Sequence, residues 1–141
     1  MDANELAHRV AHKMLDGEGT GPAWNIKIEE AREGHVRLSM AIRSDMLNSH
    51  GIAHGGMIFA LADTAFAYVC NGANHATVAA QASIVFLDKV REGETLIAEA
   101  TEVAREGRAG VTRVAVRADD GRTVAEFTGY SRTVGGPVIE I

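Results

Sequence analysis

The sequence has one cysteine, two prolines and no basic tract. The single cysteine, Cys70, cannot form a disulfide within the chain, which is typical of proteins from a reducing compartment. The 14 lysines and arginines against 19 aspartates and glutamates give a net charge of −5 at pH 7, so we expect neither nucleic acid nor a membrane as partner. The first residues contain no apolar stretch of the kind found in signal peptides, so we expect a cytoplasmic protein.

What the chain does contain is typical of one folded domain. Hydrophobic residues make up 46% and charged residues 23% of the 141 positions, which predicts a single domain over residues 1–141. Residues 3–15 are predicted to form a short helix with apolar side chains on one side. The glycine-rich stretch 17–22 is interpreted as a connector, because a phosphate-binding loop needs a strand before it and a helix after it.

Apolar and polar residues alternate after this connector, which predicts β-strands. A first hairpin is expected from Trp24–Ile28 and Val36–Ile42, joined at Gly34. Further strands are expected near 77–88, 95–105, 109–118 and 122–132, with turns at Gly93, Gly107 and Gly121. Short turns make consecutive strands antiparallel neighbours. Residues 78–87 are apolar on both faces, so this strand is expected to be central in the sheet or buried in an interface.

One segment breaks the β pattern. Residues 56–72 are rich in alanine, lack proline and carry a single charge, Asp63, which predicts a helix. A membrane span needs about 20 apolar residues, so this run is interpreted as a buried helix. It is apolar all round and therefore needs contacts on all sides, which an antiparallel sheet wrapped around one central helix provides. The expected fold class is α+β.

Asp63 and the segment before it are the candidate functional residues. A carboxylate is rarely buried without a partner, so Asp63 is either structural at a subunit contact or a functional group with a perturbed pKa. Gly55 and Gly56 open the helix and leave backbone N–H groups at its positive end. They either relieve crowding there or bind an anion or a developing oxyanion.

Other chemistries have weaker support. The histidine pairs at positions 8 and 12 and at positions 50 and 54 have no nearby Glu or Cys to complete a zinc site, so we expect no metal and no cofactor. No Gly-x-Ser-x-Gly motif occurs. Cys70 is flanked by apolar residues and is interpreted as a small hydrophobic residue rather than a nucleophile.

The segment from Asn48 to Tyr68 resembles the signature of the hotdog-fold acyl-CoA thioesterases, in particular the phenylacetic acid degradation thioesterase family. The resemblance rests on the His-Gly-Gly sequence at 54–56 and on Leu-Ala-Asp-Thr-Ala at 61–65, and it extends over most of the chain. It implies a hotdog fold, a homodimer that commonly forms a dimer of dimers, and active sites shared between opposing subunits. The implied partner is an acyl-CoA substrate, with phenylacetyl or hydroxyphenylacetyl as the acyl group.

The resemblance also implies a role for each motif residue. The N–H of Gly55 or Gly56 would hold the thioester carbonyl oxygen, and Asp63 would act as general base or nucleophile. Asn48 would orient the water or the acid, and His54 would brace the loop. The substrate-binding residues expected from the same segment are Gly56, Phe59 and Phe66. Some relatives carry a serine on the following strand where this chain has Ala79, although Gln81 and Ser83 are close by.

Two other functions remain open at this point. A hotdog dehydratase or hydratase would pair a catalytic histidine with the acid and approach the helix through prolines, which are absent here. A non-catalytic acyl-CoA-binding module would not need a lone acid inside an apolar helix. The CoA phosphates require cations, and the candidates near strand ends are Lys89, Arg91, Arg108 and Arg113.

Overall fold

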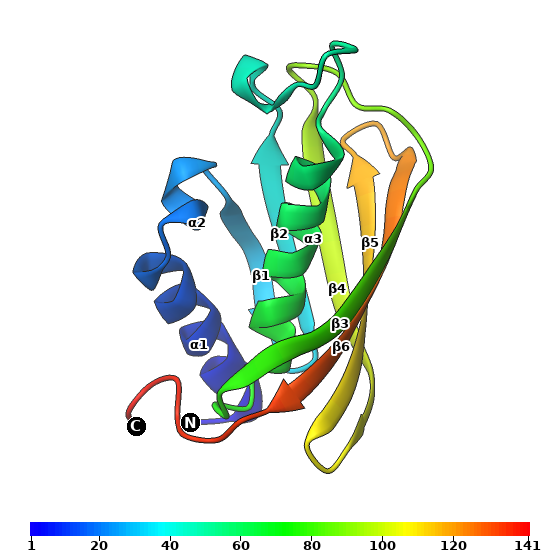
Figure 1. Cartoon of the computed structure of the whole chain (residues 1–141). Coiled ribbons are helices and arrows are strands. Elements are labelled where there is room, and N and C mark those ends of the chain that lie inside the picture. Colours follow the sequence, from blue (N-terminus) through cyan, green and yellow to red (C-terminus); the bar gives the residue numbers. More distant parts are fainter.

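The helix α3 (Gly55–Cys70) lies at the centre of the computed structural model, which describes residues 1–141, and one six-stranded sheet wraps around it (Figure 1). Every pair of neighbouring strands is antiparallel, in the order β1-β2-β4-β5-β6-β3. The strands are β1 (Lys27–Arg32), β2 (His35–Ala41), β3 (Thr77–Phe86), β4 (Thr95–Glu106), β5 (Ala109–Ala118) and β6 (Thr123–Thr133). The α+β class and the hotdog arrangement expected from the sequence are confirmed.

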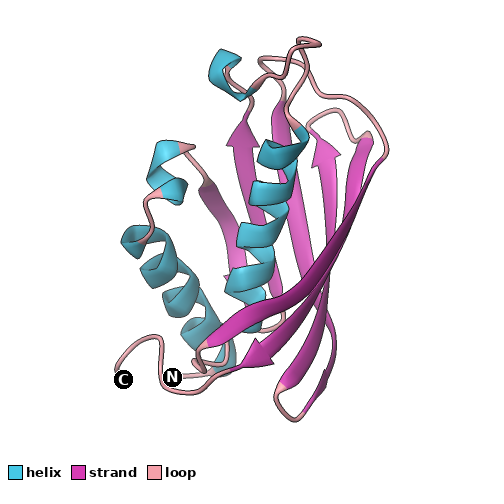
Figure 2. Cartoon of the chain, in the orientation of Figure 1, coloured by secondary structure: helices cyan, strands magenta, loops and turns pink.

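Helix α1 (Ala3–Gly17) packs beside α3 on the same face of the sheet, as Figure 2 shows. The Asp2 carboxylate accepts a hydrogen bond from the N–H of Glu5 at 2.8 Å and caps this helix, which confirms the expected N-terminal helix. The glycine-rich connector contains one unexpected element, the four-residue helix α2 (Thr20–Ala23). Pro22 is compatible with it because the first turn of a helix needs no internal N–H donors.

The hydrophobic core lies between α3 and the inner face of the sheet. From the helix, Leu61 and Ala65 are fully buried, and from the strands so are Leu38, Leu96 and Phe127. Burying a leucine or phenylalanine side chain stabilises a fold by about 1.5–3 kcal/mol relative to leaving it exposed, so this one interface holds helix and sheet together. None of the helices is long and apolar enough to span a membrane.

The first strand begins later than the alternation predicts. Asn25 has a φ of 53°, in the left-handed region, so the chain turns between Trp24 and Ile26 and β1 begins only at Lys27. The placement of Trp24 in a strand was therefore wrong. The expected turn glycines are confirmed, since Gly34 and Gly121 both have positive φ values, 70° and 94°.

Strand β3 does not pair with β4, although the turn at Gly93 predicts that these two strands are neighbours. It pairs with β6 at the edge of the sheet, while β4 lies between β2 and β5, so β3 and β4 are not neighbours and the central position was wrong. The connection over residues 87–94 is long enough to cross the end of the sheet, where the carbonyl of Val90 accepts a hydrogen bond from the N–H of Ala53 at 2.8 Å. The edge leaves Val85 and Phe86 half exposed.

Helix α3 is also less enclosed than expected. Ala60, Asp63 and Ala67 recur at helical spacing and form a stripe that is only partly buried, whereas the opposite side lies in the core. The prediction that this helix is in contact on all sides was therefore wrong for a single chain, because six strands do not close completely around it.

Candidate active site

The loop before α3 is closed by the side chain of Asn48. Its Oδ1 accepts hydrogen bonds from the N–H of His50 at 2.9 Å and from the N–H of Ile52 at 3.4 Å. The Asn48 N–H donates to the carbonyl of Ile52 at 2.8 Å, so the loop turns back on itself. The amide oxygen of Asn48 therefore braces the loop, and its Nδ2 group has no partner within the chain.

His54 caps the start of α3 and makes the backbone N–H groups of the two following glycines different. Its Nδ1 accepts a hydrogen bond from the N–H of Gly56 at 2.8 Å, which leaves the other ring nitrogen to carry the proton in the neutral ring. The His54 N–H donates to the carbonyl of Met46 at 2.8 Å and fixes the entry of the chain into the helix. The Gly55 N–H has no partner, so of the two glycines it is Gly55 that offers a free donor at the positive helix end.

The ring of Phe86 covers the α-carbon of Gly55. A Cβ atom built on Gly55 would lie 3.1 Å from Cζ of Phe86, closer than ordinary contacts allow. A Cβ atom on Gly56 would lie 2.9 Å from Nδ1 of His54. A side chain at either position would therefore press on a neighbouring ring, which would have to shift. Sequence reasoning missed Phe86, and the signal that could have found it is the apolar character of both faces of residues 78–87.

Asp63 lies partly buried in the middle of α3 and has neither a hydrogen-bond partner nor an ion-pair partner within the chain. Burial raises the pKa of its carboxyl above the ordinary value, because the charged form loses contact with water. The hydroxyl of the neighbouring Thr64 is engaged elsewhere, since it donates to the carbonyl of Ala60 at 2.7 Å. An unpaired carboxylate with a raised pKa is a stronger base than an exposed aspartate.

Gly55 and Asp63 are far apart within one chain. They are eight positions apart on one helix, which is about 12 Å along its axis. Groups that act on one carbonyl must lie within about 3–3.5 Å of the reacting atoms. The structure therefore provides both groups without bringing them together in one chain.

The two predicted aromatic residues differ in their surroundings. Phe66 is 1% exposed and packs in the core against Phe127 and Gly129, so it is a core residue whose side chain offers no free surface to a substrate. Phe59 is only partly buried and lies one turn beyond Gly55, with its ring edge-on to Phe127 at 5.4 Å between centroids. Phe59 is therefore the better candidate for a substrate contact.

The candidate phosphate-binding cations fall into two groups. Lys89 and Arg91 are exposed in the connection that bonds to the segment before α3, so they lie at the Gly55 end of the sheet. Arg108 lies at the β4–β5 turn, which Figure 1 places at the opposite end, and Arg113 is paired with Glu126.

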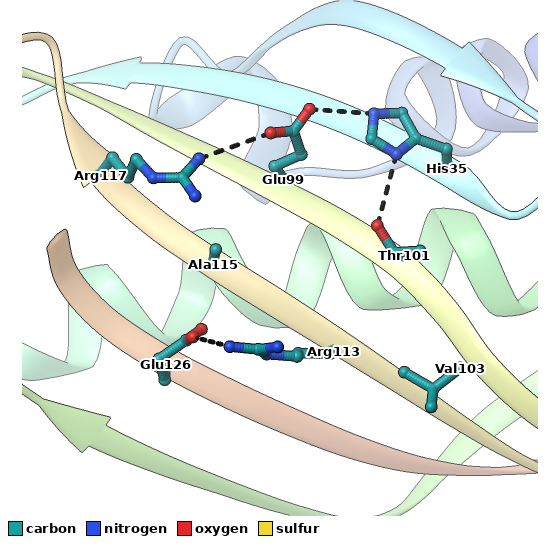
Figure 3. A pocket seen from close by; sticks show the side chains of 8 residues that line it. All are labelled: His35, Glu99, Thr101, Val103, Arg113, Ala115, Arg117 and Glu126. Atoms are coloured by element: carbon teal, nitrogen blue, oxygen red, sulfur yellow. Dashed lines mark hydrogen bonds and ion pairs between the residues drawn. The ribbon is translucent and has the colours of Figure 1, made fainter. Parts of the chain in front are cut away.

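The largest cavity lies on the outer face of the sheet, away from α3 (Figure 3). It has a volume of about 520 Å³ and does not include Asp63. Glu99 pairs there with His35 at 3.1 Å and with Arg117 at 3.6 Å, and Arg113 pairs with Glu126. Because these charges neutralise one another, the cavity is not a ready site for an anion.

Comparison with known proteins agrees with this geometry. Residues 50–125 match the thioesterase superfamily. The chain is 39% identical to the acyl-coenzyme A thioesterase PaaI of Escherichia coli (strain K12) over 137 residues, which cover 94% of this chain and 97% of that protein. Two solved structures are similar as well. The E. coli PaaI protein from the phenylacetic acid degradation operon superposes with a TM-score of 0.94 at 36% identity, covering 96% of this chain and 99% of that chain.

The second structure is a hypothetical thioesterase from Streptococcus pneumoniae TIGR4, solved with coenzyme A. It has a TM-score of 0.78 at 28% identity and covers 80% of this chain and 91% of that chain. The matched segment includes the His54 cap, the free Gly55 N–H and the unpaired Asp63. The chain belongs to the thioesterase superfamily and is a hydrolase of thioester bonds.

Proposed function

We propose that this enzyme hydrolyses acyl-CoA thioesters, with phenylacetyl-CoA or hydroxyphenylacetyl-CoA as its preferred substrates. The observation that carries the proposal is the unpaired, partly buried Asp63 on a helix whose first residue, Gly55, has a free N–H. The identity to an acyl-coenzyme A thioesterase and the likeness to a protein from a phenylacetic acid degradation operon support the substrate class. The buried free thiol of Cys70 agrees with the proposed cytoplasmic location.

The proposed mechanism assigns one task to each residue. The Gly55 N–H, aided by the helix dipole, binds the carbonyl oxygen and stabilises the negative charge that develops on it. Asp63 either removes a proton from the attacking water or attacks the carbonyl carbon itself, and in both cases water supplies the hydroxyl of the product acid. The carbon–sulfur bond breaks, and CoA leaves as the thiol after it takes up a proton. Asn48 positions the water through its free Nδ2 group, and His54 holds the donor in place.

The proposed active site belongs to a homodimer, because Gly55 and Asp63 of one chain are about 12 Å apart along α3. In the dimer, Gly55 of one protomer faces Asp63 of its partner. The free edge of β3 supports this assembly, since exposed apolar edge strands pair readily with another chain. We expect Val85→Asp to separate the protomers and to abolish hydrolysis. Val134→Asp, on an exposed residue beyond β6, is the matched control. A Val85→Asp protein that sediments as an active dimer would rule out this edge.

A dimer of dimers is proposed to form through the outer face of the sheet. That face carries both signs of charge, with Arg113 and Arg117 beside Glu99 and Glu126 (Figure 3). A second dimer related by a two-fold axis can place arginines opposite glutamates. Sedimentation should then show a tetramer at low salt that dissociates to dimers in about 1 M salt, because salt screens such contacts. A species unaffected by salt would argue against this face.

The proposed activity is tested with a panel of CoA thioesters and a reagent that detects free thiols. Phenylacetyl-CoA and hydroxyphenylacetyl-CoA should release CoA with the highest kcat/KM, followed by straight-chain acyl-CoAs. An enoyl-CoA distinguishes the alternative functions, because a hydratase would consume its double bond without releasing thiol. Binding of CoA esters without turnover would leave only the acyl-CoA-binding module.

A further inference from the structure

Phe86 is a large apolar residue that is only partly buried. It is 50% exposed, although its backbone is fixed at the end of β3 by pairing with Ala125 of β6. Ile84 and Ala125 lie on the inner face of the sheet, and Phe86 shares that face because side chains alternate along a strand. Its ring therefore projects from the inner face, past the end of the core, onto the start of α3.

The contact partner of the ring is Gly55. Three ring atoms, Cζ, Cε1 and Cε2, would lie 3.1–3.6 Å from a Cβ atom at this position, so the ring rests on the α-carbon beside the free N–H. One side of the ring is thus packed, and the residue as a whole is 50% exposed in the single chain. An exposed aromatic ring beside the proposed oxyanion donor is available to contact whatever is bound there.

The surroundings of Phe86 favour the acyl group of the substrate, rather than its CoA portion, as the group that contacts the ring. Phe59 lies one turn further along α3 on the Gly55 side of the helix, and its ring is edge-on to the buried Phe127. Phe86 and Phe59 are therefore both aromatic neighbours of the start of α3. An acyl group gains from such surroundings, whereas the phosphates of CoA need cations, which lie in the connection at Lys89 and Arg91.

We propose that Phe86 forms one wall of the acyl pocket and selects aryl over alkyl acyl groups. This inference rests on the proposed thioesterase function. The ring stacks against the substrate ring in an offset or edge-to-face arrangement, and it shields the Gly55 N–H from water while the carbonyl oxygen is bound there.

The experiment compares kcat/KM for phenylacetyl-CoA with kcat/KM for hexanoyl-CoA in the full-length protein. We expect Phe86→Ala to lower the ratio of these two values roughly 2- to 10-fold, as expected for the loss of one aromatic pair. Phe86→Tyr keeps the ring and should keep the ratio. Val134→Ala, on an exposed residue beyond β6, should also keep it. Sedimentation of each variant shows whether the assembly is unchanged.

Each outcome separates this inference from the proposed function. An unchanged ratio in Phe86→Ala with active wild-type enzyme overturns the inference alone. A KM that rises equally for both substrates also overturns it, because the ring would then contact the shared CoA portion. Wild-type protein that releases no thiol from any CoA ester would overturn the proposed function and the acyl pocket with it.

Discussion

Replacing Asp63 with asparagine tests the proposed chemistry most directly. The amide has nearly the same shape but cannot take up a proton from water or attack a carbonyl. Because the carboxylate has no partner within the chain, the substitution breaks no hydrogen bond or ion pair there. We expect kcat to fall about 10²- to 10⁴-fold, which corresponds to about 2.7–5.4 kcal/mol of lost transition-state stabilisation.

The same substitution should change the dependence of stability on pH. The pKa of Asp63 is raised in the folded chain, so the folded state binds this proton more tightly than the unfolded state does. The contribution of Asp63 to stability is therefore fully present below the unfolded pKa and is lost as the pH rises through the folded pKa. Asp63→Asn should consequently melt at a higher temperature than the wild type at pH 7, and this difference should shrink below about pH 4.

Both effects are measured on one purified protein, by thiol release and by thermal melting from pH 3 to 8. The wild-type kcat/KM should fall with decreasing pH around a value above the ordinary aspartate pKa, since Asp63 must be ionised to act. A well-folded Asp63→Asn protein with wild-type turnover would refute the catalytic assignment. A melting temperature that drops strongly at pH 7 would show instead that the carboxylate stabilises a subunit contact.

The remaining predictions concern the start of α3 and the buried thiol. Gly55→Pro removes the free N–H and should lower kcat about 10²- to 10³-fold. Gly55→Ala keeps the N–H and only presses on Phe86, so it is the control. Equal losses of kcat in the two variants would show a packing effect. His54→Ala removes the cap on Gly56 and should cost about 1 kcal/mol in urea unfolding, which His54→Asn should largely restore; no difference between the two would exclude capping. Burial raises the pKa of the Cys70 thiol to about 12, so alkylation by iodoacetamide at pH 8 should be far slower in the folded protein than in urea, and equal rates would contradict its burial.

The elements that the sequence predicts well are those set by local signals. The central helix follows from an apolar run with one charge, and the turns follow from glycines at positions that need positive φ. The late start of β1 depends on a single left-handed residue, Asn25, within an alternating pattern, and period-two counting does not detect it.

The elements that it predicts poorly depend on contacts between distant segments. The edge position of β3 is decided by pairing with β6, about 45 residues later, and no feature of residues 77–86 specifies that partner. Which of the two glycines keeps a free N–H depends on the orientation of the His54 ring, because this ring accepts a hydrogen bond from the N–H of Gly56. Phe86 becomes part of the candidate site only because the edge strand ends over Gly55.

The distance between Gly55 and Asp63 on one helix has a chemical advantage in the proposed dimer. The positive end of a helix stabilises negative charge mainly within its first turn. A carboxylate placed there would have a lowered pKa and would be a weaker base, and it would compete with the carbonyl oxygen for the same N–H. Asp63 lies beyond that turn and keeps a raised pKa through burial, while Gly55 keeps its donor free. In the proposed dimer a two-fold axis would bring each protomer's Asp63 to its partner's Gly55, so one helix would supply complementary halves of two identical sites.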